Sequence, residues 1–130
     1  MIFLDTNIII YQVENREPEF AKVLAQLALL GSQPLAVSRL SELECLVKPL
    51  RDRNADLQAE YERFFLSPEL HIVELSAAVL RRATHIRARH GVRTPDALVA
   101  ACCLVDTPDA TFLTNDTGFQ SIDGLKVVFL

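Results

Sequence analysis

Short apolar runs alternate along the chain with longer stretches in which apolar residues recur every three or four positions. The runs are typical of buried strands and lie at residues 2–4, 35–37, 71–73, 111–113 and 126–129. The longer stretches predict helices over 8–13, 18–30, from Ser38 or Ser41 to about Pro49, 54–66, 76–90 and 94–105. Short strands that alternate with helices favour an α/β fold, in which a mostly parallel sheet of about five strands has helices on both faces.

Cap and stop residues place several helix ends. Pro18 suits a first helical turn, and Gly31 ends the helix that follows it. Ser76 is an N-cap candidate. Thr94 before Pro95 predicts an N-cap followed by proline at the first helical position.

The composition is that of a globular protein, with 50% hydrophobic and 23% charged residues in a chain of 130. This length predicts one domain over residues 1–130. No apolar run approaches the 18–20 or so residues of a membrane span, and Asp5 interrupts the first run too early for a secretory signal. Three cysteines without a Cys-x-x-Cys spacing predict reduced core thiols rather than structural zinc. We therefore expect a cytoplasmic protein without membrane contact.

Charge is unevenly distributed along the chain. The formal net charge is −4, yet residues 81–93 contain five arginines and no acid. An acidic molecule with one basic segment can hold a cation in one place and a phosphate chain in another.

Acidic residues follow the strands of the predicted sheet. Asp5 comes directly after the first strand and Asp116 shortly after the fourth, while Asp96 opens a helix. Glu42 and Glu44 both lie in the first turns of the helix after the second strand. Ligands of such sheets bind beyond the carboxyl ends of the strands, so four carboxylates are expected to converge there. Each acid taken singly also fits a helix cap or a turn, and Ser41 with Glu44 matches a capping box.

Gathered carboxylates repel one another unless a cation lies among them. Oxygen ligands without histidine or cysteine favour a hard ion such as Mg²⁺ over zinc. A metal of this kind supports phosphodiester hydrolysis, because it polarises the phosphate and acidifies a bound water. Thr6, Thr114 and Asn115 lie beside the acids and are candidates to donate hydrogen bonds to water or phosphate, or to act only in turns.

Four segments carry a resemblance to a known family. They are Ile2–Asn7, Val37–Glu44 continuing to Pro49–Arg51, Arg93–Leu98 and Phe112–Asp116. In this order and over nearly the whole chain, they resemble the PIN-domain nucleases, and among these the VapC-type toxins of type II toxin–antitoxin systems.

The resemblance implies a three-layer PIN fold and a metal-dependent endoribonuclease. It assigns Asp5, Glu44, Asp96 and Asp116 as the acidic quartet that binds Mg²⁺ or Mn²⁺ and cleaves RNA. Glu42 is the second choice for the position given to Glu44, and the two lie on different helix faces. The resemblance also implies a homodimer and a cognate antitoxin protein that covers the active site.

Two surfaces are candidates for partners. The possible RNA contacts are Arg81, Arg82, Arg89 and Arg93, although a solvated helix face explains the first three equally well. The helices at 18–30 and 54–66 are candidates to form a groove for an antitoxin helix, with contacts from Leu24, Leu27, Leu57, Tyr61, Phe64 and Phe65.

A non-catalytic PIN-like module that binds RNA or protein remains the alternative. A receiver-like phosphoacceptor domain is disfavoured because Glu74, not aspartate, follows the third strand. A haloacid-dehalogenase-like phosphatase would need an acid where Asn7 stands.

Overall fold

A parallel sheet lies at the centre of the computed structural model, which describes residues 1–130. Its strands are β1 (Ile2–Leu4), β2 (Leu35–Ser38), β3 (His71–Val73), β4 (Thr111–Thr114) and β5 (Lys126–Phe129), in the order β3-β2-β1-β4-β5. All neighbouring strands are parallel; Phe3 in β1 is paired with Ala36 on one side and Phe112 on the other. The predicted α/β fold is confirmed, and each predicted strand is present to within one residue.

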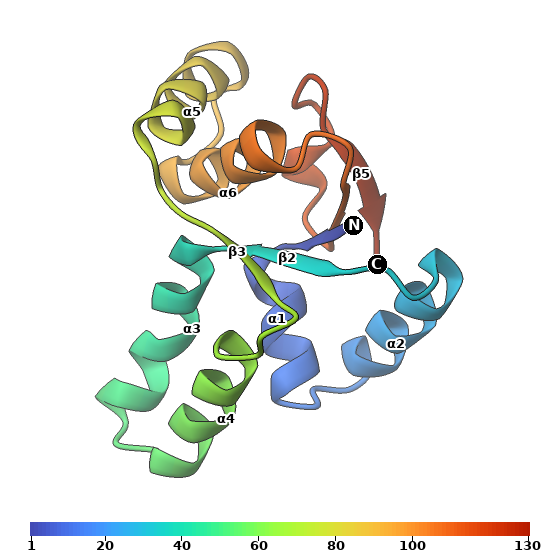
Figure 1. Cartoon of the computed structure of the whole chain (residues 1–130), viewed down its shortest axis with the longest axis vertical. Helices are drawn as coiled ribbons and strands as arrows, with labels where there is room; N and C mark the ends of the chain where they lie inside the picture. The colour runs from blue at the N-terminus through green and yellow to red at the C-terminus, as the bar shows by residue number, and fades with distance from the viewer.

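Helices cover both faces of the sheet. They are α1 (Thr6–Val13), α2 (Glu19–Leu30), α3 (Arg39–Arg51), α4 (Ala55–Phe65), α5 (Ala77–His90) and α6 (Thr94–Asp106). Figure 1 shows α5 and α6 on one face and α1 to α4 on the other. Because side chains of a strand alternate between faces, Phe3 packs in the core cluster of α5 and α6, whereas Ile2 and Leu4 pack in that of α1 to α4. This three-layer arrangement leaves the carboxyl ends of the strands open.

The ends of α3 decide one alternative and correct one prediction. Ser38 is the N-cap, since its hydroxyl accepts a hydrogen bond from the backbone N–H of Leu40. The predicted capping box that starts at Ser41 is therefore absent. The helix also continues past Pro49 to Arg51. A proline in the last turn removes a single backbone hydrogen bond, and the ring of Pro49 is buried.

The start of α6 differs from the prediction by one residue. Arg93, with extended backbone, is the N-cap, and Thr94 is the first helical residue. Pro95 therefore stands one position further into the helix than predicted. Both positions suit proline, because the first backbone N–H groups of a helix have no partner within it. Arg93 is therefore the N-cap of the helix whose first turn contains Asp96.

A short 3-10 helix, η1 (Thr117–Phe119), was not predicted. The Asp116 carboxylate accepts a hydrogen bond of 2.8 Å from the backbone N–H of Gly118. An aspartate two residues before a glycine is a turn signal in the sequence that would have located it. The turn fixes Asp116 against the end of β4.

Two of the predicted partner contacts on α4 are wrong. Tyr61 is 1% exposed and Phe65 is 5% exposed, so both belong to the core beneath α4. Phe64 is only partly buried and Leu24 on α2 is 48% exposed. Adjacent aromatic residues on a helix point in different directions, which is why Phe65 is inside and Phe64 is available at the surface.

Three smaller predictions also have outcomes. The cysteines are all unpaired and buried, as predicted for core thiols. Burial raises the pKa of the Cys103 thiol to about 11, so it stays protonated and unreactive at neutral pH. None of the six helices has the length and apolar character needed to cross a membrane.

Candidate active site

Four acidic side chains line one cavity of about 240 Å³ at the carboxyl end of the sheet. They are Asp5, Glu44, Asp96 and Asp116. Asp5 directly follows β1 and Asp116 follows β4, two strands that are neighbours in the sheet. The second turn of α3 and the first turn of α6 bring Glu44 and Asp96 to the same cavity. The structure thus brings together the four acids that the sequence selected.

Asp5 is the most buried of these acids, at 7% exposure. Its Oδ1 accepts a hydrogen bond of 2.8 Å from the backbone N–H of Thr6, and its Oδ2 accepts one of 2.7 Å from the Thr114 hydroxyl. Burial raises the pKa of Asp5 to about 6, and the charges of Asp96 and Asp116 add to this effect against the two hydrogen bonds. Ionisation of Asp5 in the folded protein is therefore less favourable than in water, and a nearby cation would stabilise the ionised form.

A chain of hydroxyl groups orients Glu44. The Thr6 hydroxyl donates to Glu44 Oε1 at 2.9 Å and lies 2.8 Å from the Ser41 hydroxyl. Because Thr6 has one hydroxyl proton and gives it to the carboxylate, Ser41 must donate to Thr6. Ser41 is fully buried. Sequence reasoning missed this role, since it interpreted Ser41 only as a helix cap.

Thr114 links two of the acids. Its hydroxyl donates to Asp5 and accepts a hydrogen bond of 3.0 Å from the backbone N–H of Asp116. Asn115 donates instead to the hydroxyl of Tyr11 on α1, at 2.7 Å. Thr6, Thr114 and Asn115 were candidates to donate to water or phosphate or to act only in turns, and in the structure their side-chain donors bind protein groups. They position the site rather than lining it with free donors, although the Thr6 side chain also borders the cavity.

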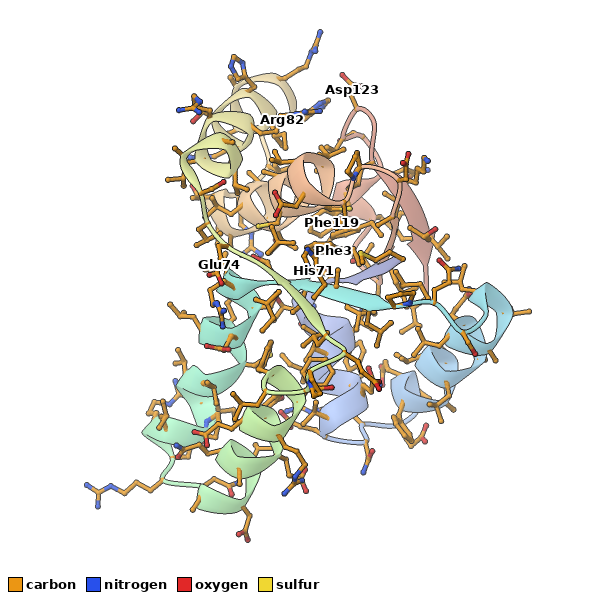
Figure 2. The ribbon with its side chains drawn as sticks, viewed as in Figure 1. Phe3, His71, Glu74, Arg82, Phe119 and Asp123 are labelled. Carbon is orange, nitrogen blue, oxygen red and sulfur yellow. The ribbon has the colours of Figure 1, made fainter.

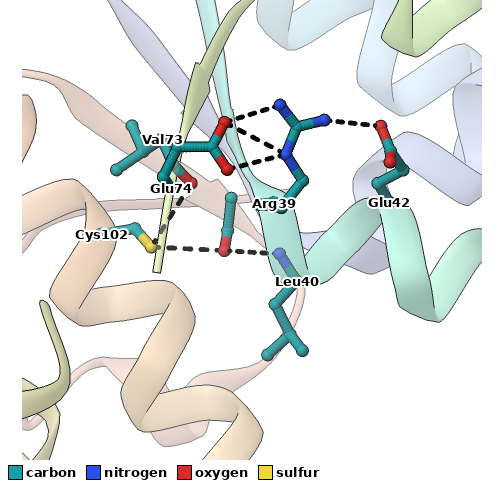
Figure 3. Close-up of polar contacts among 7 residues, drawn as sticks. Arg39, Leu40, Glu42, Val73, Glu74 and Cys102 are labelled. Atoms are coloured by element: carbon teal, nitrogen blue, oxygen red, sulfur yellow. Dashed lines mark hydrogen bonds and ion pairs between the residues drawn. The ribbon is translucent and has the colours of Figure 1, made fainter. Parts of the chain in front are cut away.

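Glu42 lies outside the cavity. Its carboxylate accepts a hydrogen bond of 3.0 Å from Arg39, whose guanidinium also binds Glu74 at the end of β3 (Figure 3). The Arg39 contact lowers the pKa of the exposed Glu74 carboxyl below its ordinary value. In the same region Ser38 lies 3.3 Å from the Cys102 thiol, which ties β2 to α6. Of the two glutamates considered for the second acidic position, only Glu44 lines the cavity.

The arginines proposed as RNA contacts fall into two groups. Arg93 lines the cavity, with its Nε 3.4 Å from Asp96 Oδ2. Arg81, Arg82 and Arg89 are exposed on α5, and none of them lines the cavity. Figure 2 shows Arg82 and Asp123 on the α5 and α6 side of the sheet. Asp123 is 3.6 Å from Arg89 and is the single acid in the hollow that Arg82 and Arg89 border.

The donor set suits a hard cation, since it consists of carboxylate oxygens without histidine or cysteine. No three acidic, histidine or cysteine side chains are close enough to enclose one ion as they stand. Glu44 is held by Thr6, and Asp96 is paired with Arg93. This spacing does not fit a closed protein cage; it fits an ion that keeps several waters, as Mg²⁺ does.

Comparisons with known structures agree with this fold. The fold is similar to that of VapBC2 of Rickettsia felis bound to a promoter DNA fragment, with a TM-score of 0.76, 23% identity and coverage of 99% and 98% of the two chains. A toxin–antitoxin complex from Klebsiella pneumoniae gives a TM-score of 0.75, 23% identity and coverage of 98% and 96%. FitAcB from Neisseria gonorrhoeae gives a TM-score of 0.74, 25% identity and coverage of 98% and 96%.

A comparison with curated protein sequences finds no significant match. The family model described as PIN domain matches residues 2–125, a range that includes all four acids of the cavity. Since this match spans nearly the whole chain and the sheet order places the acids at one edge, the chain belongs to the PIN domain family.

Proposed function

We propose that this protein is a metal-dependent endoribonuclease and the toxin of a VapBC-type toxin–antitoxin pair. The observation that carries the proposal is the cavity lined by Asp5, Glu44, Asp96 and Asp116. Four carboxylates without a cation repel a phosphodiester, so this arrangement supports RNA cleavage only if it recruits a divalent ion.

The acids and the threonines beside them have different proposed roles. Asp5, Glu44, Asp96 and Asp116 would hold Mg²⁺ or Mn²⁺. The bound ion would neutralise charge on the phosphate and acidify a water. Thr114 is hydrogen-bonded to both the Asp5 carboxylate and the backbone N–H of Asp116, and so fixes their relative positions. Thr6 orients Glu44 through a hydrogen bond. A carboxylate that remains free of the ion is then placed to accept a proton from the attacking water.

The basic helix α5 supports RNA as the substrate. Arg81, Arg82 and Arg89 are exposed on this helix, which ends three residues before Arg93 at the cavity. A chain of phosphates that follows α5 toward Arg93 would be led to the acids. Such contacts position a polyanion without reading its sequence.

The antitoxin is proposed from the similar structures, one of which is described as a toxin–antitoxin complex. Phe64 on α4 borders two adjoining hollows, one with Leu70 and one with Val13. Leu24 is exposed on α2, and α1 contacts both α2 and α4. These side chains fit the apolar face of a partner helix.

We also propose a homodimer. Leu43, Val47 and Leu50 are 59%, 49% and 56% exposed and lie on one side of α3, opposite its buried residues. Exposure of such an apolar stripe to water is unfavourable in free energy, and contact with a second copy would bury it. Sedimentation of the wild type and of Val47→Glu tests this: we expect a dimer that the variant dissociates, and a monomeric wild type would contradict it.

The two glutamates of α3 offer a matched test of the catalytic assignment. Glu44→Gln removes a charge from the cavity, whereas Glu42→Gln removes the same charge from the same helix outside it. We expect Glu44→Gln to reduce the Mg²⁺-dependent cleavage of a mixed RNA pool by about 100-fold or more, and Glu42→Gln to leave it within about threefold. Equal losses in both variants, or a loss only in Glu42→Gln, would contradict the assignment.

A further inference from the structure

We propose that Arg93 is a movable counter-ion of the acidic cavity, which releases Asp96 when a divalent cation binds and then contacts the scissile phosphodiester. This inference rests on the proposed nuclease function and assigns a role to one more residue of the same site.

Arg93 is the single basic residue among those that line the cavity. Its Nε lies 3.4 Å from Asp96 Oδ2, and its side chain is 79% exposed while that of Asp96 is 25% exposed. The other three acids of the cavity have no arginine or lysine within ion-pair distance. One cation on a flexible side chain thus partly compensates four carboxylates.

The backbone of Arg93 is fixed although its side chain is free. The carbonyl of Arg93 accepts a hydrogen bond of 2.9 Å from the N–H of Ala97, which starts α6. Next to it, the carbonyl of Val92 accepts one of 3.0 Å from Arg87 Nε on α5. The guanidinium can therefore swing from a fixed point at the mouth of the cavity without unfolding either helix.

The Arg93–Asp96 contact is of a kind that a divalent ion displaces. It is a single, solvent-exposed pair at 3.4 Å, and such pairs contribute little net stability. A divalent ion bound to Asp96 attracts the carboxylate more strongly than one guanidinium does, and it also repels the guanidinium of Arg93. Once released, a guanidinium can bind two oxygens of a phosphate at once. None of the arginines proposed on α5 lines the cavity, so they do not compete for this role.

Mn²⁺ binding tests the first half of the proposal, with Arg93→Gln, Arg93→Lys and the control Arg89→Gln. Arg89 is 75% exposed and pairs with Asp123 at 3.6 Å, so it matches Arg93 in exposure and pairing but lies outside the cavity. Free Mn²⁺ is measured by electron paramagnetic resonance during titration. We expect Arg93→Gln to tighten Mn²⁺ binding by about threefold or more, because a competing cation is removed. Arg93→Lys and Arg89→Gln should stay within about twofold of the wild type.

Cleavage of RNA at saturating Mn²⁺ tests the second half. Arg93→Gln should cleave about tenfold or more slowly despite its tighter Mn²⁺ binding, and Arg93→Lys should recover part of the loss. Unchanged or weaker Mn²⁺ binding in Arg93→Gln overturns the counter-ion role. Cleavage by Arg93→Gln at the wild-type rate overturns the phosphate contact. A wild type that binds no Mn²⁺ overturns the proposed function together with this inference, which separates that failure from the other two.

Discussion

Asp5 shows how burial and hydrogen bonding act against each other on a single carboxyl group. Burial raises its pKa from 3.8 to about 6, although Thr114 and the backbone of Thr6 both donate to it. The folded protein therefore binds a proton at Asp5 more tightly than the unfolded chain does. By linkage, this group destabilises the fold above pH 6 and the penalty is relieved as the pH falls toward 3.8.

The stability of the protein in EDTA should therefore rise on mild acidification. Between pH 7 and pH 5 the contribution of Asp5 is about 1 kcal/mol in favour of folding. Denaturant unfolding at the two pH values measures it, and Asp5→Asn serves as the control because it cannot titrate. A wild type and an Asp5→Asn variant with the same pH dependence over this window would show that Asp5 is not shifted as described.

The acidic residues of the cavity could be predicted from the sequence, but the residues that orient them could not all be. Asp5 and Asp116 follow strands, and Asp96 and Glu44 lie in the first and second turns of helices that start at the same sheet edge, so topology places all four together. Ser41 could not be found in this way, because its hydrogen bond to Thr6 depends on the approach of α1 to α3. Such a contact joins residues far apart in sequence and leaves no periodic pattern.

At the scale of elements, α1 and α3 are joined by the hydroxyl chain from Ser41 through Thr6 to Glu44. Thr6→Val keeps the side-chain shape and removes this link. We expect a loss of about 1–3 kcal/mol in the free energy of unfolding, because the buried Ser41 hydroxyl loses its acceptor, and slower RNA cleavage because Glu44 is no longer oriented.

Thr84→Val is the matched control for this change. Thr84 also carries a bonded hydroxyl on a helix, but it donates to the carbonyl of Leu80 on the exposed surface of α5. Its replacement should change stability by about 0.5 kcal/mol or less. Equal stability of Thr6→Val and Thr84→Val in thermal and denaturant unfolding would show that the hydroxyl chain does not contribute to the free energy of unfolding.

Element boundaries were predictable where one local signal dominates. Gly91 ends α5 in a left-handed conformation, and Ser76 caps its start, both as the sequence indicated. The start of α6 was one residue off because proline is tolerated at the first and second helical positions alike. The end of α3 was missed because the buried ring of Pro49 stabilises the last turn, and burial is decided by tertiary packing.

At the scale of the whole molecule, charge is separated between α5 and the acidic cavity. Arg81, Arg82 and Arg89 lie on a helix where Arg89 pairs with Asp123, while the four acids line the cavity at the sheet edge. Binding of RNA along α5 should weaken as salt rises. The combined variant Arg81→Gln, Arg82→Gln and Arg89→Gln should bind single-stranded RNA about tenfold more weakly and with a smaller salt slope.

Fluorescence anisotropy with a labelled single-stranded RNA, measured across a salt series in Ca²⁺ or EDTA to limit cleavage, follows this binding. The control exchanges arginines on the other side of the sheet, Arg51→Gln with Arg53→Gln, which are equally exposed. If the α5 variant kept the affinity and salt slope of the wild type, α5 would be a solvated helix face and RNA would reach the cavity by another route.

Cleavage of RNA in the acidic cavity must depend on both a divalent ion and Asp5. Purified wild type and Asp5→Asn are therefore incubated with a mixed RNA pool in Mg²⁺, in Mn²⁺ and in EDTA. We expect cleavage by the wild type in either metal, none in EDTA and at least about a 100-fold loss in a folded Asp5→Asn. Equal cleavage by both proteins, or cleavage that persists in EDTA, would contradict it, and a folded wild type that binds RNA without cutting it would assign the chain to the non-catalytic binding modules.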